Sequence, residues 1–282
     1  MKKIALINDL SGFGKCSLTA AIPVISVMGI QACPLPTAIL TAQTGFREYF
    51  CDDYTDKMDE FTRQWKRLGV SFDGIYSGYL AGARQVEKVL FFLEQFKQEE
   101  TLYLADPVMG DGGKPYDFFT ADFLRESKEL IRRADVITPN LTEACLLAGE
   151  EYDRLTAHSR SADYPKRIQA IAEELMEKAV SKQRVIVTGI VRHWEGKEMV
   201  GNLAVSENQS FYRETPYTGQ SFSGTGDLFA SVICGCLVKG LTMEEAVKKA
   251  VSFLQEAIAE ASRENTPAPH GVCFEQYLSR LM

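Results

Sequence analysis

Short apolar runs rich in valine and isoleucine alternate with longer amphipathic segments along the whole sequence. Such runs are typical of strands buried on both faces, and the longer segments have the three-and-four spacing of helices with one buried face. This alternation predicts an α/β fold, a three-layer sandwich in which helices flank a mostly parallel central sheet. At 282 residues and 45% apolar content, we expect a single domain over residues 1–282.

The expected elements follow from these patterns. The strands are Lys3–Asn8, Gly74–Ser77, Leu102–Asp106, Val136–Thr138 and Arg184–Thr188. The helices are Ser17–Met28, Lys57–Leu68, Arg84–Phe96, Ala121–Arg133, Leu141–Ala148, Pro165–Val180, Gly226–Val238 and Met243–Ser262. Met199–Val205 and Ser210–Glu214 are two further strands joined by a polar turn, which predicts antiparallel strands at one edge. The polar stretch Glu150–Tyr164 is expected to be a surface loop.

Gly224-Thr225-Gly226-Asp227 is a glycine-rich turn that leads directly into an apolar segment with helical spacing. Backbone N–H groups at a helix start are unpaired, and together with the positive end of the helix dipole they form a site for an anion. A carboxylate beside such a site can take the proton of a substrate hydroxyl that attacks a phosphate. Asp227 is therefore a candidate base. The alternative is an acid that only stabilises the helix dipole.

Polar residues follow the ends of five predicted strands. They are Asn8-Asp9, Ser77-Gly78-Tyr79, Asp106 to Asp111, Asn140-Leu141-Thr142-Glu143 and Thr188-Gly189. Open parallel sheets bind ligands at the carboxyl ends of their strands, so these residues are candidates for one site. Each of them alone also suits a helix cap.

Phosphoryl transfer requires carboxylates that hold Mg²⁺, directly or through water. Asp106, Asp111 and Glu143 are the candidates. Glu143 lies three residues after Asn140, so the two side chains project near each other at a helix start. The alternative is an asparagine cap followed by an acid at the favourable end of the helix. The glycines around Asp111 are flexible enough to form a lid.

Three other chemistries fail at particular positions of their motifs. Gly12-Phe13-Gly14-Lys15-Cys16-Ser17 resembles a phosphate loop, but that loop needs glycine where Asp9 stands and serine or threonine where Cys16 stands. The dinucleotide fingerprint fails because Phe229 replaces its third glycine. The serine-hydrolase turn fails because Gln220 replaces its first glycine.

Charge and composition exclude further classes. The net charge is −7 and no stripe of lysine or arginine occurs, so we expect no nucleic-acid partner. No apolar run is long enough to cross a membrane, and the first apolar run turns polar too early for a signal peptide, which predicts a cytoplasmic protein. The seven cysteines lack C-x-x-C spacing and are expected to be reduced. The three histidines lack metal-ligand spacing, which argues against structural zinc.

The chain resembles the ribokinase superfamily in Gly224-Thr225-Gly226-Asp227, Asn140-x-x-Glu143 and Asp106-Pro107-Val108-Met109-Gly110-Asp111, which occur in the order typical of that superfamily. It is most similar to the vitamin B6 kinase (pyridoxal kinase) group. That closer similarity rests on Ser77-Gly78-Tyr79-Leu80, Asp106 to Asp111, Pro139-Asn140-Leu141 and Thr41-Ala42-Gln43-Thr44-Gly45. The motifs cover nearly the whole chain.

The resemblance implies ATP-dependent phosphorylation of the 5′-hydroxymethyl group of pyridoxal, pyridoxine or pyridoxamine. Asp227 would be the catalytic base, and the amides of Gly224, Thr225 and Gly226 would stabilise the transferring phosphoryl group. Asp9, Thr44 and Tyr79 would line the pyridine pocket. Asp106, Asp111, Asn140 and Thr188 would bind the nucleotide, and Glu143 with Asp106 would hold Mg²⁺. The resemblance also implies a homodimer, and it allows a monovalent cation as a further ion.

Asp9 departs from the B6 group, whose members commonly carry serine there. Related hydroxymethylpyrimidine kinases often carry an acid at this position, but the segment after Asp9 lacks their double-glycine run. The leading expectation is therefore a B6 vitamer kinase. The alternatives are a hydroxymethylpyrimidine (phosphate) kinase, a dual-specificity kinase, and a non-catalytic B6-binding protein with the same fold.

Overall fold

The computed structural model describes all 282 residues. The chain divides into two compact units. Unit 1 comprises residues 1–104 and 220–282, and unit 2 comprises residues 105–219. The assignment of one domain to residues 1–282 stays a prediction.

Unit 1 contains a sheet with strand order β5-β4-β1-β2-β3. Its strands are β1 (Lys3–Ser11), β2 (Gln31–Leu40), β3 (Cys51–Asp53), β4 (Gly74–Ser77) and β5 (Leu102–Ala105). β1 pairs in parallel with both β2 and β4, so that Ile4 lies opposite Ala32 on one side and Gly74 on the other. β3 pairs with β2 in the antiparallel direction. The centre of β1 is fully buried, as expected for a strand covered on both faces.

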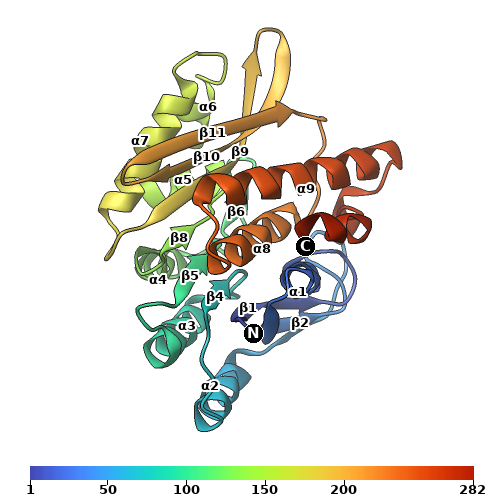
Figure 1. Ribbon diagram of the computed structural model, residues 1–282. Coiled ribbons are helices and arrows are strands. Elements are labelled where there is room, and N and C mark those ends of the chain that lie inside the picture. Colours follow the sequence, from blue (N-terminus) through green and yellow to red (C-terminus); the bar gives the residue numbers. More distant parts are fainter. The chain divides into compact units, whose positions relative to one another are not determined.

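Helices cover both faces of this sheet, which gives three layers (Figure 1). They are α1 (Ser17–Val27), α2 (Met58–Arg67), α3 (Ala83–Phe96), α8 (Thr225–Val238) and α9 (Met243–Arg263), with short 3₁₀ turns η1 (Thr55–Lys57), η2 (Ala268–His270) and η3 (Glu275–Leu281). The chain crosses from β1 to β2 on one side and returns past β1 to β4 and β5 on the other. Right-handed crossovers therefore put α1 on one face and α2 and α3 on the opposite face. α8 packs on α1, and α9 packs on α8.

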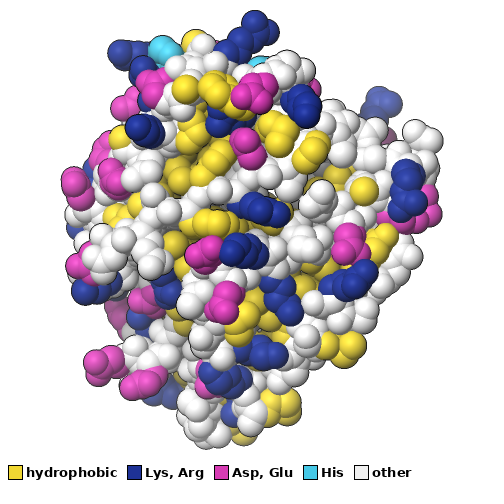
Figure 2. All heavy atoms as spheres, turned by 45° about the horizontal axis from the view of Figure 1, so that its top comes forward, with side chains coloured by type: hydrophobic (Ala, Val, Ile, Leu, Met, Phe, Trp, Pro, Cys, Tyr) yellow, Lys and Arg dark blue, Asp and Glu magenta, His cyan; other side chains and the backbone are white.

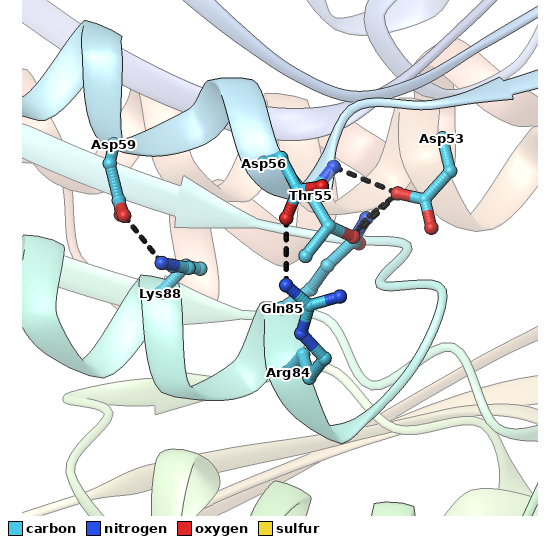
Figure 3. Close-up of polar contacts among 7 residues, drawn as sticks. All are labelled: Asp53, Thr55, Asp56, Asp59, Arg84, Gln85 and Lys88. Atoms are coloured by element: carbon cyan, nitrogen blue, oxygen red, sulfur yellow. Dashed lines mark hydrogen bonds and ion pairs between the residues drawn. The ribbon is translucent and has the colours of Figure 1, made fainter.

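Polar side chains tie α3 to η1 and α2 (Figure 3). The amide nitrogen of Gln85 donates to Oγ1 of Thr55 at 2.9 Å, and Arg84 pairs with Asp56 at 2.7 Å. Lys88 pairs with Asp59. Trp65, Phe72, Phe92 and Phe96 form an aromatic cluster between α2 and α3, with ring centroids 4.6–6.0 Å apart. These contacts join the second helical layer of unit 1.

Unit 2 has strand order β8-β9-β10-β11. Its elements are β6 (Gly110–Asp111), β7 (Lys114–Pro115), α4 (Ala121–Arg132), β8 (Val136–Ile137), α5 (Leu141–Ala148), α6 (Tyr152–Thr156), α7 (Tyr164–Glu177), β9 (Arg184–Trp194), β10 (Lys197–Ser206) and β11 (Gln209–Pro216). β8 and β9 are parallel, whereas β10 is antiparallel to both β9 and β11. β6 and β7 form a separate small hairpin. α7 packs on β9 and β10, and α5 packs on α7.

The structure confirms the predicted α/β class with helices flanking a mostly parallel sheet, and it confirms the antiparallel edge strands. Several elements differ from the prediction. β2, β3, β6 and β7 were not among the predicted strands, and β1 continues to Ser11. β9 continues six residues past Thr188, because β10 pairs with that extension. The segment predicted as a loop, Glu150–Tyr164, contains α6.

Basic and acidic side chains are interspersed on the face in Figure 2. Several of the ion pairs are exposed and lie one turn apart on a helix, such as Arg63 with Glu60 and Arg125 with Asp122. Pairs of this kind add little to stability because water screens them. No helix has the length and apolarity needed to cross a membrane. All seven cysteines are unpaired.

Candidate active site

The glycine turn of unit 1 opens α8, as predicted. Gly224 precedes the helix with φ +81°, a backbone conformation that favours glycine, and no side chain caps the helix start. A Cβ at Gly224 would overlap the carbonyl oxygen of Lys15 and approach Cα of Cys16 at 2.9 Å. The turn therefore requires glycine because the segment before α1 packs directly against it. The first N–H groups of α8 have no intrahelical acceptor.

Asp227 lies in the first turn of α8 and keeps part of its surface open to solvent. Its Oδ1 accepts a hydrogen bond from Nδ2 of Asn8 at 3.1 Å, and the backbone N–H of Ser17 also donates to its carboxylate. Burial raises the pKa of Asp227 to about 6. The negative charge of Asp9 acts in the same direction, while the two hydrogen bonds oppose it. Asp227 thus combines a helix N-terminus with a carboxyl group that changes protonation state close to neutral pH.

Asp9 lies at the end of β1 and is only 5% exposed. One of its carboxylate oxygens accepts from Oγ of Ser11 at 2.8 Å, and the other accepts from Oγ of Ser17. Burial raises the pKa of Asp9, and the two serine hydroxyls lower it. Asp9 was predicted to contact the pyridine ring, and each of its carboxylate oxygens accepts a hydrogen bond from a serine hydroxyl.

Tyr79 follows β4 and is fixed through its backbone. Its N–H donates to Oδ1 of Asn8 at 2.7 Å, and its carbonyl oxygen accepts from Oγ1 of Thr37 at 3.0 Å. Burial raises the pKa of the Tyr79 hydroxyl, and the charges of nearby residues including Asp9 add to that effect. Thr44 is exposed on the loop after β2.

Gln43 joins the loop after β2 to the glycine turn. Its side chain is 7% exposed, and its Nε2 donates to the carbonyl oxygen of Pro269 at 2.9 Å and to Oγ of Ser223 at 3.2 Å. Three aromatic rings, those of Phe13, Phe46 and His270, come from the segments joined in this way, with centroids 5.2–5.6 Å apart. Phe13 is 53% exposed. This group offers an open aromatic surface in unit 1.

In unit 2, Asn140 and Glu143 form the capping box of α5. Oδ1 of Asn140 accepts from the N–H of Glu143 at 3.0 Å, and Oε2 of Glu143 accepts from the N–H of Asn140 at 2.8 Å. Oε1 of Glu143 accepts from the N–H of Met109 at 3.0 Å, so the same carboxylate also holds the loop before β6. Glu143 is 4% exposed, and burial, with the charge of Asp106, raises its pKa well above the usual range. Asn140 and Glu143 therefore form the helix cap that was the alternative to a metal-binding role for this pair.

The other predicted nucleotide residues of unit 2 lie around the same capping box. Asp106 accepts from Oγ1 of Thr138 at 2.6 Å, and Asn140 forms a parallel bridge with Thr188. Nδ2 of Asn140 donates to the carbonyl oxygen of Gly110 at 2.8 Å, and the charges of Asp106 and Asp111 both act on Glu143. Unit 2 therefore brings together Asp106, Asp111, Asn140, Glu143 and Thr188. Unit 1 brings together Asp9, Tyr79 and Asp227.

No group of three or more histidine, cysteine, aspartate or glutamate side chains is arranged to hold a metal ion. Each carboxylate oxygen of Glu143 accepts one hydrogen bond from a backbone N–H group. Asp106 lies close enough to Glu143 for the charges of the two carboxylates to interact. This arrangement fits Mg²⁺ that is held through water and nucleotide phosphates, which is the usual preference of that ion.

Sequence reasoning missed three residues of unit 1. Asn8 was noted only because it follows a strand, while Ser17 and Gln43 were assigned no role. The available signals were the position of Asn8 beside Asp9 and the place of Ser17 at the start of a helix. The contacts of all three join segments far apart in the sequence, so local patterns do not reveal them.

Residues 14–270 match the model of the phosphomethylpyrimidine kinase family. This match covers most of the chain, and the chain therefore belongs to that family. The pyridoxal kinase PdxY of Rubrobacter xylanophilus is 26% identical over 270 residues, which cover 92% of this chain and 88% of that protein. The matching relatives thus agree with the predicted B6 kinase group of the ribokinase superfamily.

Solved structures share the fold over nearly the whole chain. A putative phosphomethylpyrimidine kinase from Bacteroides thetaiotaomicron, crystallised with pyridoxal, is 37% identical with a TM-score of 0.91, covering 99% of this chain and 95% of that one. Pyridoxal kinase from Lactobacillus plantarum is 27% identical with a TM-score of 0.87, covering 100% and 96%. Pyridoxal kinase from Leishmania donovani in complex with ADP and pyridoxamine, 19% identical with a TM-score of 0.83, shares the fold over 100% and 96%.

Proposed function

We propose that this protein transfers the γ-phosphoryl group of ATP to the 5′-hydroxymethyl group of a B6 vitamer. The observation that carries the proposal is Asp227, a partly exposed carboxylate in the first turn of α8 with a pKa of about 6. An effective general base has a pKa near the working pH. The unpaired N–H groups of a helix start form a favourable binding site for an anion such as the transferring phosphoryl group. Asp227 and Gly224 supply both within one turn of chain.

In this proposal, Asp227 accepts the proton of the vitamer hydroxyl as its oxygen attacks the γ-phosphorus. The bond from that phosphorus to the β,γ-bridging oxygen of ATP breaks, and ADP leaves with the bonding electrons. The N–H groups at Gly224, Thr225 and Gly226 stabilise the charge on the transferring phosphoryl group. Tyr79 and the open aromatic group of Phe13, Phe46 and His270 are suited to a planar ring.

Unit 2 would serve the nucleotide. Asn140, Asp111 and Thr188 would contact its phosphates, while Asp106 and Glu143 would hold Mg²⁺ through water molecules. When bound, the ion supplies neutralisation of the phosphate charge. The capping box fixes Asn140 and Glu143 relative to each other, so the two side chains are already ordered before a nucleotide binds.

Replacing Asp227 by Asn removes the base but keeps its size. We expect turnover with saturating ATP and pyridoxal to fall about 100-fold or more, with ATP affinity unchanged. Asp122→Asn is the matched control, because Asp122 is an exposed acid in the first turn of α4, and its replacement removes an acid at a helix start together with an exposed ion pair that adds little to stability. Near-normal turnover of Asp227→Asn would show that another group acts as the base.

The family match and the name of the Bacteroides relative favour a second candidate, a hydroxymethylpyrimidine (phosphate) kinase or a dual-specificity enzyme. The two are separated by kcat/KM for pyridoxal, pyridoxine, pyridoxamine and hydroxymethylpyrimidine on one preparation. We expect the highest value with a B6 vitamer. A higher value with the pyrimidine would replace the proposal by the second candidate, and binding of pyridoxal without ATP consumption would favour a non-catalytic role.

A further inference from the structure

Asn8 links three parts of unit 1 through one amide group. Its Nδ2 donates to Oδ1 of Asp227 at 3.1 Å, and its Oδ1 accepts from the N–H of Asp9 at 3.0 Å and from the N–H of Tyr79 at 2.7 Å. The side chain is 1% exposed, so water does not compete for these bonds. With both backbone N–H groups on its oxygen, the amide has only one orientation, and its nitrogen must point at Asp227.

Ser17 makes a second link to the same carboxylate. Its backbone N–H donates to Asp227, and its Oγ donates to Asp9. Ser17 has φ +50°, an uncommon conformation for a residue with a Cβ, so the surrounding structure holds it there. Asp9 contributes to that hold through its hydrogen bond with Oγ of Ser17, and its carboxylate also accepts from Ser11.

The titratable groups that face Asp227 are few. Asp9 approaches from β1, and Cys16 approaches from the segment before α1. Burial, followed by the charges of Asp227 and Asp9, raises the pKa of Cys16 to about 12, so its thiol is neutral at physiological pH. The Asp9 carboxylate is thus the charged group beside Asp227, and it is only 5% exposed, with a serine hydroxyl on each of its oxygens.

From this geometry we propose that Asn8 and Asp9 are positioning residues for Asp227, Asn8 directly and Asp9 through Ser17, and that Asp9 is not a ring contact. The inference rests on the proposed role of Asp227 as base. It reassigns Asp9 from vitamer recognition to orientation of the reacting carboxylate. The side chain of Asn8 then holds both the backbone of Tyr79 and the carboxylate of Asp227.

The two residues act on the protonation of Asp227 in opposite directions. The Asn8 hydrogen bond favours the charged carboxylate, so its loss raises the pKa of Asp227. The charge of Asp9 disfavours a second charge nearby, so its removal lowers the pKa of Asp227. A residue that stabilises the fold without contacting Asp227 would leave the acid limb of the pH profile where it is.

The test measures kcat and KM from pH 4.5 to 8.5 with saturating ATP for Asn8→Asp, Ser17→Ala and Asp9→Asn. Asn8→Asp keeps an oxygen for the two backbone N–H groups, removes the donor to Asp227 and adds a negative charge beside it, and both changes raise the pKa of Asp227. We expect kcat of Asn8→Asp and Ser17→Ala to fall about tenfold or more for every vitamer, because misplacement of a reacting group is costly. The acid limb of the kcat/KM profile should move to higher pH for Asn8→Asp and to lower pH for Asp9→Asn.

Gln183→Ala is the matched control, because Gln183 is 4% exposed and its amide bridges the backbone carbonyls of Ile131 and Ala134 in unit 2. It should leave kcat per folded molecule and the pH profile unchanged. Asn8→Ala is measured beside Asn8→Asp, because it removes the same hydrogen bond without adding a charge, and its acid limb should also move to higher pH. Folding of each variant is checked by thermal denaturation.

Two results would overturn the inference. One is wild-type kcat in Asn8→Asp and Ser17→Ala while Asp227→Asn is inactive, which leaves the proposed function intact. The other is a raised KM for the vitamers in Asp9→Asn without change in kcat or in the acid limb, which would restore Asp9 as a ring contact. Activity of Asp227→Asn itself would instead reject the base on which the inference depends.

Discussion

At the scale of single residues, the protonation state of Asp227 controls the proposed chemistry. A base must be deprotonated, and burial raises the pKa of this carboxyl to about 6. Below that pH the proton is already on Asp227 and the substrate hydroxyl cannot transfer its own. At higher pH the carboxylate is free to accept it.

We therefore expect kcat/KM for the vitamer, with saturating ATP, to fall as the pH drops through about 6 and to level off above it. The measurement is kcat/KM against pH in buffers of constant ionic strength, with Asp122→Asn as a control that should give the same curve. An acid limb near the pKa of an ordinary aspartate, or no limb at all, would contradict the assignment.

The sequence predicted residues that act through short-range spacing and missed those that act at long range. Asn140 and Glu143 are three residues apart, and their capping box follows from that spacing. Asp227 follows from the glycine turn. By contrast, no local pattern indicates that Asn8 contacts Asp227, and the same carboxylate pattern in Glu143 suits both a cap and a metal ligand.

At the scale of elements, the glycine turn depends on a close backbone approach. The φ of +81° at Gly224 strains any other residue, and a Cβ would overlap the carbonyl of Lys15. Gly226, two residues on, has no atom within 4 Å of a Cβ placed on it. The two glycines of one turn thus differ in what they tolerate.

We expect Gly224→Ala to lower the free energy of unfolding by about 3 kcal/mol or more. Gly226→Ala should change it by less than about 1 kcal/mol, because a helical position favours alanine and the site has room. Chemical denaturation of the two variants and the parent protein measures this difference. Equal stabilities would mean that the segment before α1 moves away from the turn at little cost.

Elements were predicted best where their sequence follows the usual pattern. β1, β4 and β8 are short buried runs and appear where expected. β2 was missed because Pro34 and Pro36 argue against a strand. Both prolines lie where β2 pairs only with β1, since β3 begins its pairing at Ala38, so the missing N–H groups leave no ladder bond unmade.

At the scale of the whole molecule, the class of fold follows from the alternation of strands and helices, but the division into two units does not. Unit 1 is assembled from two pieces separated by all of unit 2. Sequence patterns report the type of each element and not which distant elements pack together, so the single-domain expectation contained no information about this division.

Thiol reactivity reports on both units at once. Cys51 is exposed and Cys33 and Cys273 are partly exposed, whereas Cys16, Cys145, Cys234 and Cys236 are buried. We expect a thiol reagent such as Ellman's reagent to label three cysteines quickly in the native protein at pH 8 and the other four only with denaturant. Cys51→Ser should reduce the fast group to two. More than three fast thiols in the parent protein would contradict the packing described for α1, α5 or α8.

The bond between Asn8 and Asp227 spans 219 residues of sequence. During synthesis from the N-terminus, Asn8, Asp9 and Ser17 leave the ribosome long before the carboxylate that they hold. Contacts of such separation also close slowly in refolding, because the intervening chain must lose much of its freedom first. The proposed catalytic activity therefore arises late in folding. A nascent or truncated chain that ends before α8 would contain Asn8, Asp9 and Ser17 but not Asp227, the carboxylate that they orient.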